Sequence, residues 1–343
     1  MTDADASLFD PHNVQARAAR DGIVQPDGQP YVPYQYDSDG EIVLHVRVAL
    51  ATNRPLLLSG PPGAGKSTLA RDVALCLGRR YYEKVVTSRT QARDLQWRWD
   101  AVARLADAQG TKTWIGTPNR FVDPEILWWA FAPASAARRG LGASVTPPPG
   151  FPAPIDPCWR FTRGRQQIVG GPSTVILLDE IDKADPDVPN DLLVALGERR
   201  FMVEETRDEI TSEAARSALV CITTNGERDL PPAFLRRCIT LELGLPQAQT
   251  MKEIIRRHVP EADTAIVSDL IARHELMVAA TDSPASRPPG TAELIDAARA
   301  AAAVLNKYPV TERPKRLERL LAATLWKRKE PMPSPPGAVE AKV

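Results

Sequence analysis

Short apolar runs of strand length alternate with helical patterns over the first 245 residues. The runs lie at 55–59, 81–86, 175–178, 219–223 and 239–243, and the helical patterns at 41–52, 69–77, 91–108, 124–132 and 189–198. The run at 175–178 is continuously apolar, which is typical of a strand buried on both faces of a parallel sheet. We therefore expect an α/β domain over 41–245, with a parallel five-stranded sheet between helices.

The pattern changes after residue 245, where no further run looks like a strand. Helical patterns occupy 248–258, 263–276, 291–305 and 313–329. These predict a small all-helical domain over 246–330 that follows the α/β domain. The last residues, 331–343, are rich in proline, and we expect them to form a disordered tail.

Residues 1–40 are polar and broken by prolines, so we expect an arm laid on the next domain rather than a domain of its own. Tyr31, Tyr34 and Tyr36 lie in this arm. They could pack the arm onto its host, or they could bracket an adenine ring. The residues alone leave both interpretations open.

Three further segments suggest contact surfaces or local structure. Residues 138–172 hold many prolines, glycines and arginines, which predicts a long inserted loop that either contacts a partner or is merely solvated. Trp128 and Trp129 are adjacent on a predicted helix, so one of them is either an exposed contact residue or buried under the insertion. The segments 200–205 and 208–211 alternate enough for a hairpin.

The amino-acid composition limits the classes of partner and the compartment that we expect for this protein. The 343 residues contain 43 lysines and arginines and 43 aspartates and glutamates, so no net charge draws the chain to nucleic acid or to a membrane surface. The four cysteines form no C-x-x-C pair, which suits a reducing compartment. No run approaches the length of a membrane span and no signal peptide is evident, so a cytoplasmic protein is expected.

The chemistry centres on a glycine-rich stretch between a predicted strand and a predicted helix. It consists of Gly60, Pro61, Pro62, Gly63, Ala64, Gly65, Lys66, Ser67 and Thr68. The spacing G-x-x-x-x-G-K-[ST] is that of a phosphate-binding P-loop, in which glycines let backbone N–H groups approach the phosphates. Lys66 can reach the outer phosphates of ATP, Ser67 can ligate Mg²⁺, and the helix N-terminus favours the anion.

Two more polar groups follow predicted strands. Asp179 and Glu180 end the run at 175–178 and suit a magnesium ligand and a base that deprotonates the attacking water. The alternative is that they cap the next helix. Asn225 ends the run at 219–223, where ligands bind in parallel α/β sheets. It can bond the attacking water or a terminal phosphate, although Asn-Gly alone is only a turn.

Arg236 and Arg237 end a short helix before the last predicted strand. On their own they indicate favourable charge against the helix dipole. Four motifs precede the predicted helical domain, in the order GPPGAGKST, VILLDEIDKAD, ITTN and LPPAFLRRC. In this order of motifs the chain resembles the AAA+ ATPases. The phrase from Asp179 to Asp185, with 189–193, looks most like the MoxR-type branch. The resemblance covers about 41–305.

This resemblance implies a P-loop NTPase core with a helical lid, an ATPase that uses ATP and Mg²⁺, and a homo-oligomeric ring, with a hexamer as the expected size. It makes Lys66, Ser67 and Thr68 Walker A residues, Asp179 and Glu180 Walker B residues, and Asn225 sensor 1. Arg237, or else Arg236, becomes the finger that reaches a neighbour's ATP.

The MoxR-type relatives are similar in working beside von Willebrand factor A-type proteins, which implies a chaperone-like role on a protein partner. Two departures stand out. Aligned on the lid helix, Arg287 lies two residues before the position of the sensor 2 arginine in related ATPases, so its role as sensor 2 stays open. The segment after the second strand also lacks the pore loop of the ATPases that thread and unfold proteins. A nucleotide-dependent scaffold or switch with little turnover, in defence or signalling, is the rival function.

Overall fold

The computed structural model describes residues 9–37, 40–109, 117–148, 150–168, 170–213, 218–279, 289–305, 308, 316–317 and 319–320. The chain divides into two compact units. The core unit comprises Met1–Ser59 and Lys66–Glu242, and the helical unit comprises Gly60–Gly65 and Leu243–Val343. The glycine-rich loop is grouped with the second part of the chain. One boundary between the two units therefore lies inside the glycine-rich motif, between Gly65 and Lys66.

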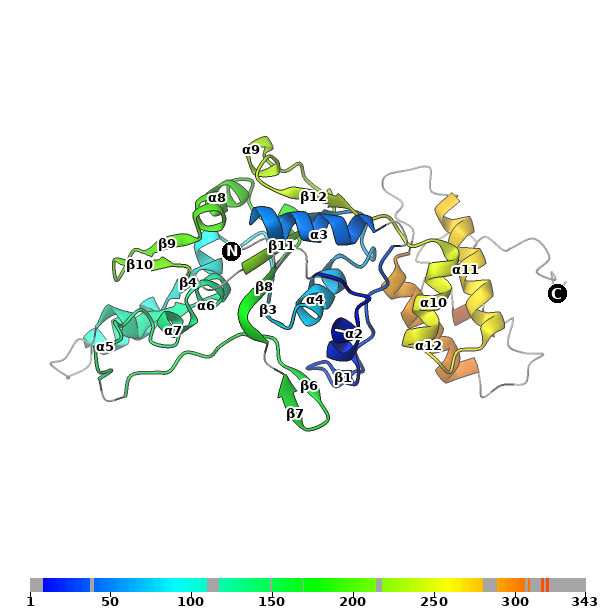
Figure 1. The fold of residues 1–343 in the computed structure, drawn as a ribbon, viewed down its shortest axis with the longest axis horizontal. Coiled ribbons are helices and arrows are strands. Elements are labelled where there is room, and N and C mark those ends of the chain that lie inside the picture. Colours follow the sequence, from blue (N-terminus) through cyan, green and yellow to red (C-terminus); the bar gives the residue numbers. More distant parts are fainter. Residues whose placement is uncertain are drawn as a thin grey trace. The chain divides into compact units, whose positions relative to one another are not determined.

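A five-stranded parallel sheet forms the centre of the core unit (Figure 1). Its strands, in spatial order, are β12 (Ile239–Glu242), β2 (Leu56–Ser59), β11 (Ala218–Thr224), β8 (Gly171–Asp179) and β3 (Arg79–Val85). Every neighbouring pair is parallel. This confirms the predicted α/β fold, and it brings the carboxyl ends of β2, β11 and β8 to one edge, side by side.

Helices cover both faces of this sheet. The main ones are α3 (Glu41–Thr52), α4 (Lys66–Cys76), α6 (Ile126–Phe131) and α8 (Val188–Glu198). Ile176 and Leu178 share a buried core with α6 and α8, and their neighbours Val175 and Leu177 point to the opposite face because side chains alternate along a strand. Helix α4 packs on β8 and β3, and Figure 1 shows α4 and α6 on opposite sides of these strands.

The N-terminal segment lies on α4. It includes α2 (Val14–Arg20) and the short strand β1 (Ile23–Val24). The hydroxyls of Tyr31 and Tyr36 donate to the carboxylate of Asp72, at 2.5 and 2.7 Å, and Arg20 pairs with the same carboxylate at 2.9 Å. The packing interpretation of these two tyrosines is therefore confirmed, because their hydroxyls are bound to Asp72.

The helix predicted over 91–108 is wrong in its first half. A 3₁₀ turn, η1 (Ala92–Leu95), leads into strand β4 (Trp97–Trp99), and only then does helix α5 (Ala101–Gln109) begin. Strand β4 pairs antiparallel with β5 (Val122–Pro124), after the 3₁₀ turn η2 (Pro118–Phe121). The tryptophans two positions apart follow the period of a strand, which the helical periodicity of α5 obscured.

The inserted segment 138–172 is not wholly irregular. Strands β6 (Phe161–Arg163) and β7 (Gln166–Ile168) form a hairpin that also pairs with β1. Gly164 supplies the turn with φ +59°. Its proline-rich part, before residue 158, holds no strand or helix among the described residues, which agrees with the loop prediction there.

Trp128 and Trp129 are both buried, with exposed fractions of 0 and 5%. Helix α6, which packs on the adjoining α7 (Pro133–Ala136), lies against the predicted hairpin, β9 (Arg200–Val203) and β10 (Asp208–Thr211). Phe201 of β9 contacts the Trp128 ring edge-on. The idea that an exposed tryptophan marks a contact surface is therefore wrong, because both residues belong to the core that also contains Ile176 and Leu178 of the central sheet.

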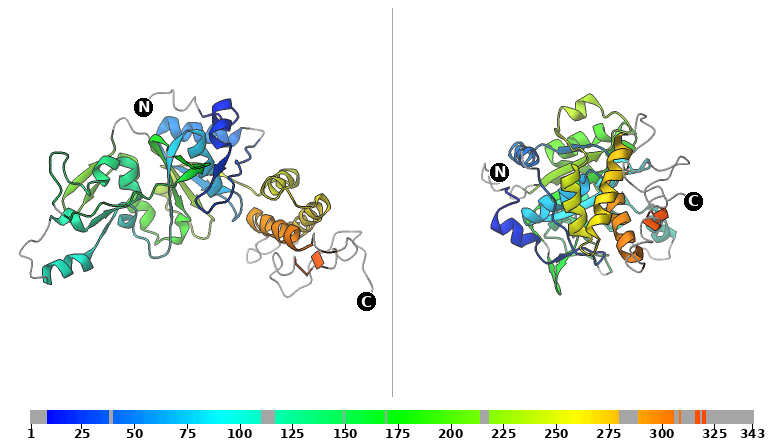
Figure 2. Two further views of the ribbon diagram at one scale, coloured as in Figure 1. Left: turned by 90° about the horizontal axis from the view of Figure 1, so that it is seen from below. Right: turned by 90° about the vertical axis from the view of Figure 1, so that its right-hand side faces the viewer.

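Beyond the loop, the described part of the helical unit is mainly helical, and its helices are the yellow and orange ribbons of Figure 2. They are α10 (Ala248–His258), α11 (Thr264–Ala279) and α12 (Thr291–Leu305), and all three pack on one another. Met251, Leu270 and Leu294 lie in their shared core. The predicted helix at 313–329 falls mostly, and the tail at 331–343 wholly, outside the described residues. Of the helices described, none is long and apolar enough to cross a membrane.

Candidate functional site

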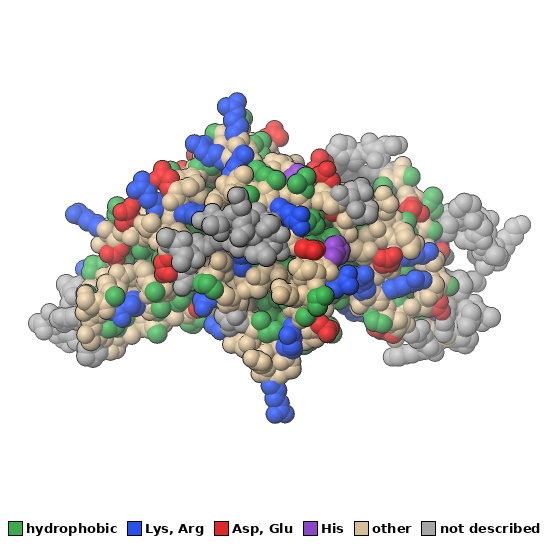
Figure 3. Space-filling model, in the orientation of Figure 1, with side chains coloured by type: hydrophobic (Ala, Val, Ile, Leu, Met, Phe, Trp, Pro, Cys, Tyr) green, Lys and Arg blue, Asp and Glu red, His purple; other side chains and the backbone are tan. Residues whose placement is uncertain are grey.

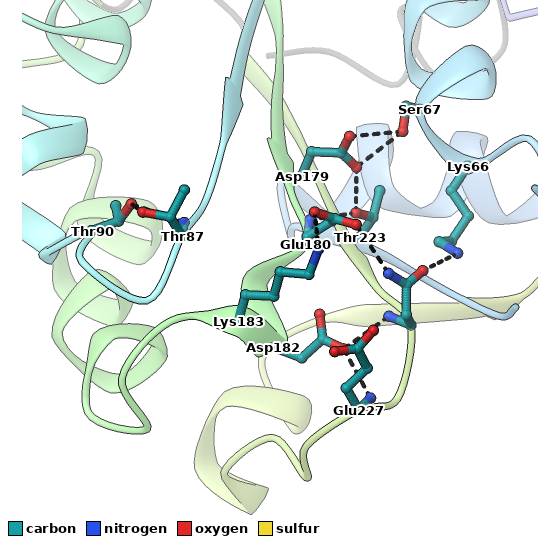
Figure 4. A network of polar contacts seen from close by, with 11 residues as sticks. Lys66, Ser67, Thr87, Thr90, Asp179, Glu180, Asp182, Lys183, Thr223 and Glu227 are labelled. Carbon is teal, nitrogen blue, oxygen red and sulfur yellow. Dashed lines mark hydrogen bonds and ion pairs between the residues drawn. The ribbon is translucent and has the colours of Figure 1, made fainter. Parts of the chain in front are cut away.

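Two carboxyl ends of the central strands and the start of α4 bring a polar network together in the core unit (Figure 4). Asp179 ends β8, and its carboxylate accepts the Ser67 hydroxyl of α4 at 2.9 and 3.0 Å. The Thr223 hydroxyl of β11 donates to the same carboxylate at 2.5 Å. The predicted magnesium ligands, Ser67 and Asp179, are therefore in direct contact.

Asn225 links the lysine of the glycine-rich motif to the acid that follows β8. Its side-chain oxygen accepts from the Lys66 ammonium at 2.8 Å, and its side-chain nitrogen donates to Glu180 at 3.2 Å. These two contacts fix the orientation of the amide, because a flipped amide would place its NH₂ group against the lysine. Three residues from distant parts of the sequence thus form one chain of hydrogen bonds.

Glu180 has a left-handed backbone, with φ 62° and ψ 50°. Few non-glycine residues adopt this conformation, and it is found at functional sites. Its N–H donates to the Thr223 hydroxyl at 2.8 Å. Its carboxylate pairs with Lys183 at 2.6 Å, and that hydrogen bond raises the pKa of the Lys183 ammonium above its usual value. The alternative that Asp179 and Glu180 cap a helix is not favoured, because α8 starts at Val188.

Sequence reasoning missed three members of this network. Thr223 joins Asp179 to Glu180, Lys183 pairs with Glu180, and Asp182 accepts the backbone N–H groups of Asn225 and Glu227, each at 3.0 Å. The available signal for Asp182 and Lys183 was their place directly after Asp179 and Glu180, in the 3₁₀ turn η3 (Ile181–Lys183). Thr223 had no signal beyond being polar at a strand end.

The glycine-rich loop itself belongs to the helical unit. Gly60, Gly63 and Gly65 have φ of +141°, +81° and +87°, which other residues rarely adopt. A side chain at Gly63 would place its Cβ 2.6 Å from the Cα of Gly290, just before α12. Within the loop, the Ala64 N–H donates to the carbonyl of Pro61 at 3.2 Å, and Pro62 approaches Gly290 through its backbone.

The residues present suit Mg²⁺, which prefers hard oxygen ligands and usually takes one or two carboxylates together with substrate phosphates. The Ser67 hydroxyl and the Asp179 carboxylate supply such oxygens next to each other. No cluster of three His, Cys, Asp or Glu residues that could hold a metal occurs in the described ranges. The remaining ligands would be phosphate oxygens and water, which is usual for Mg²⁺. Thr68 follows in the first turn of α4.

Arg236 and Arg237 lie at the end of α9 (Pro232–Leu235) and are exposed. Over α9, basic side chains project from the surface seen in Figure 3. Neither guanidinium has a carboxylate partner among the described residues, and Arg237 makes only a long contact of 3.4 Å with the carbonyl of Ala233. Arg54 donates to the carbonyls of Arg236, Arg237 and Cys238, which fixes the backbone of this turn. Arg287 lies outside the described residues.

A comparison with protein-family models identifies the type of domain. The family described as the AAA domain (dynein-related subfamily) matches residues 55–238. Two solved structures of RuvB from Thermotoga maritima are similar, each with a TM-score of 0.45 and 16% identity. One, described as the Holliday junction branch migration motor, aligns over 88% of this chain and 73% of its own, and the other, a point mutant, over 87% and 74%. This likeness carries no argument about function. No curated protein sequence matches the chain.

Proposed function

The chain belongs to the AAA domain family of the dynein-related subfamily, and on that premise we propose that it binds and hydrolyses ATP to remodel or activate a protein partner. The contacts among Lys66, Asn225 and Glu180, beside the pair of Ser67 and Asp179, are the observation that supports hydrolysis. A module that only binds nucleotide has no need of a glutamate and an amide held next to its phosphate-binding lysine.

Each residue has a distinct task in this proposal. The Lys66 ammonium leaves the Asn225 oxygen and pairs with the outer phosphates. Asn225 and Glu180 then hold the attacking water, and Glu180 accepts its proton. Ser67 and Asp179 would hold Mg²⁺, which would neutralise charge on the phosphate oxygens. Thr223 keeps the Asp179 carboxylate and the Glu180 backbone in fixed relation, since it bonds to both.

Positive charge opposite the attacking water is supplied in trans. Arg237, with Arg236 beside it, is exposed and has no carboxylate partner among the described residues, so it is available to a neighbouring copy. A charge delivered in this way accelerates phosphoryl transfer by roughly 10³-fold or more. The functional unit is then a homo-oligomeric ring, expected to be a hexamer.

The MoxR-like phrase at 179–193 supports a chaperone-like, cytoplasmic ATPase with a von Willebrand factor A-type partner. A second candidate is an assembly scaffold or switch with little turnover. It is favoured by the ion pair of Lys183 with Glu180, which already engages the base.

Mixing two defective variants tests the trans arrangement. Glu180→Gln and Arg237→Ala should each turn over ATP slowly, and a mixture should recover activity, because an Arg237→Ala site can receive the arginine of a Glu180→Gln neighbour. Arg207→Ala, which changes an exposed arginine on the β9–β10 turn, is the control for lost charge. A mixture no faster than the average of its components contradicts the trans finger. Wild type that assembles on ATP without hydrolysing it supports the scaffold instead.

A further inference from the structure

Asp182 is a buried carboxylate that no step of the proposed reaction uses. Only 3% of its surface is exposed. It follows Glu180 by two residues, in the turn η3, and one of its oxygens accepts the N–H groups of Asn225 and Glu227, each at 3.0 Å. One carboxylate oxygen thus holds two backbone groups of the turn that carries Asn225.

The other carboxylate oxygen of Asp182 is buried and has no hydrogen-bond partner within the described part of the chain. Burying an unsatisfied acceptor is unfavourable, and such groups in native structures call for an explanation. Hydrogen bonds from N–H groups to a carboxylate are stronger than those to a neutral oxygen. Burial of one Asp182 oxygen therefore destabilises the fold. The other oxygen fixes the backbone of the turn that carries Asn225 through two charge-assisted hydrogen bonds.

The hydrogen bond between Asp182 and the Asn225 backbone joins segments that follow two neighbouring strands. Glu180 and Asp182 follow β8, whereas Asn225 follows β11, and β8 and β11 are adjacent in the sheet. Asn225 must place its oxygen toward Lys66 and its nitrogen toward Glu180 at the same time. Because Asp182 holds the Asn225 backbone from the turn that carries Glu180, the distance between the amide and the base is set by a single local unit.

We propose that Asp182 is a positioning residue that sets Asn225 against Glu180 for the hydrolysis of ATP. Asp182 has no contact with Lys66 or Ser67 among the hydrogen bonds described, so it acts through Asn225. This inference rests on the proposed function, because it concerns the geometry of the hydrolytic step. It assigns no part in nucleotide binding to Asp182.

The test compares Asp182→Ala, Asp182→Asn and the control Asp185→Ala. Asp185 is an exposed aspartate of the same segment, and its side chain accepts the Asp187 N–H. Asp182→Ala should lower kcat roughly tenfold to a hundredfold, as expected for a misplacement of about 1 Å, with little change in the Kd for ATP. Asp182→Asn keeps an oxygen that can accept an N–H bond, so its kcat should lie between wild type and Asp182→Ala. Asp185→Ala should match wild type.

Two measurements distinguish positioning from a merely structural role. Hydrogen exchange should become faster at Asn225 and Glu227 in Asp182→Ala. In an Asn225→Ala background, removing Asp182 should change kcat by less than about twofold, because groups acting through one another are not additive. Full additivity, or an unchanged kcat in Asp182→Ala despite faster exchange, overturns the positioning role alone. Wild type without turnover overturns the proposed function, and the positioning role with it.

Discussion

The N-terminal segment should hold the core unit together through one carboxylate. Asp72 is completely buried and accepts hydrogen bonds from Arg20, Tyr31, Tyr36 and the Tyr34 backbone. Asp72→Ala leaves the Arg20 guanidinium, itself only 7% exposed, without its carboxylate partner, although two backbone carbonyls still accept from it. Breaking a buried ion pair in this way costs about 3 to 5 kcal/mol. For a unit of this size, that corresponds to a fall in Tm of about 6 to 20 °C.

The assay follows thermal unfolding of the full chain together with hydrogen exchange of residues 14–36. Asp72→Ala should lower the unfolding temperature of the core unit and speed exchange in the arm, because the tyrosine hydroxyls lose their acceptor. Asp72→Asn should have a smaller effect, since its oxygen can still accept one hydroxyl. Asp27→Ala, an exposed aspartate that caps the Gln29 N–H, is the control. Equal effects of Asp72→Ala and Asp27→Ala would refute the anchoring role.

Two other predictions concern the helical unit. Gly63→Ala should destabilise it more than Gly28→Ala destabilises the core unit, as measured by thermal unfolding. Both glycines have φ near +80°, but of the two only an alanine at position 63 would press its Cβ against backbone atoms. Equal losses of unfolding temperature in the two variants would contradict this steric argument. Burial, with a smaller effect of Arg299, lowers the pKa of His258 below its ordinary 6.5. The unfolded chain then takes up this proton first, so the helical unit should lose stability as pH falls below 6.5. His258→Gln should flatten this dependence, and His45→Gln in the core unit should not.

The centre of the sheet was predictable because β2, β8 and β11 each contain a continuous apolar run that is followed by polar residues. Val175 to Leu178 is one such run, and a continuous apolar run of this length is typical of a strand buried on both faces of a parallel sheet. The order of the strands was not predictable, because it depends on pairings between runs far apart in the sequence. Strand β4 was missed for a related reason: only three residues long, it is defined by its pairing with β5 rather than by its own pattern.

The candidate site was predictable where spacing carries chemistry. The glycines and Lys66 follow from a motif, and Asp179 and Glu180 follow from a strand that ends in two acids. Their contacts were not predictable. The bond between Lys66 and Asn225 joins residues 159 positions apart. For the tryptophans of α6 the sequence left exposure and burial open, and the structure shows both residues buried, with Phe201 of β9 against Trp128.

The central claim is that this chain hydrolyses ATP with Glu180 as the base. The most direct measurement is steady-state phosphate release by wild type and Glu180→Gln at equal, saturating ATP and Mg²⁺, with the Kd for ATP measured on both. The account predicts that wild type turns over, and that Glu180→Gln is slower by roughly 10² to 10⁴-fold with a similar Kd. Equal phosphate release by both proteins, or no release by wild type at concentrations where it self-associates, would contradict it.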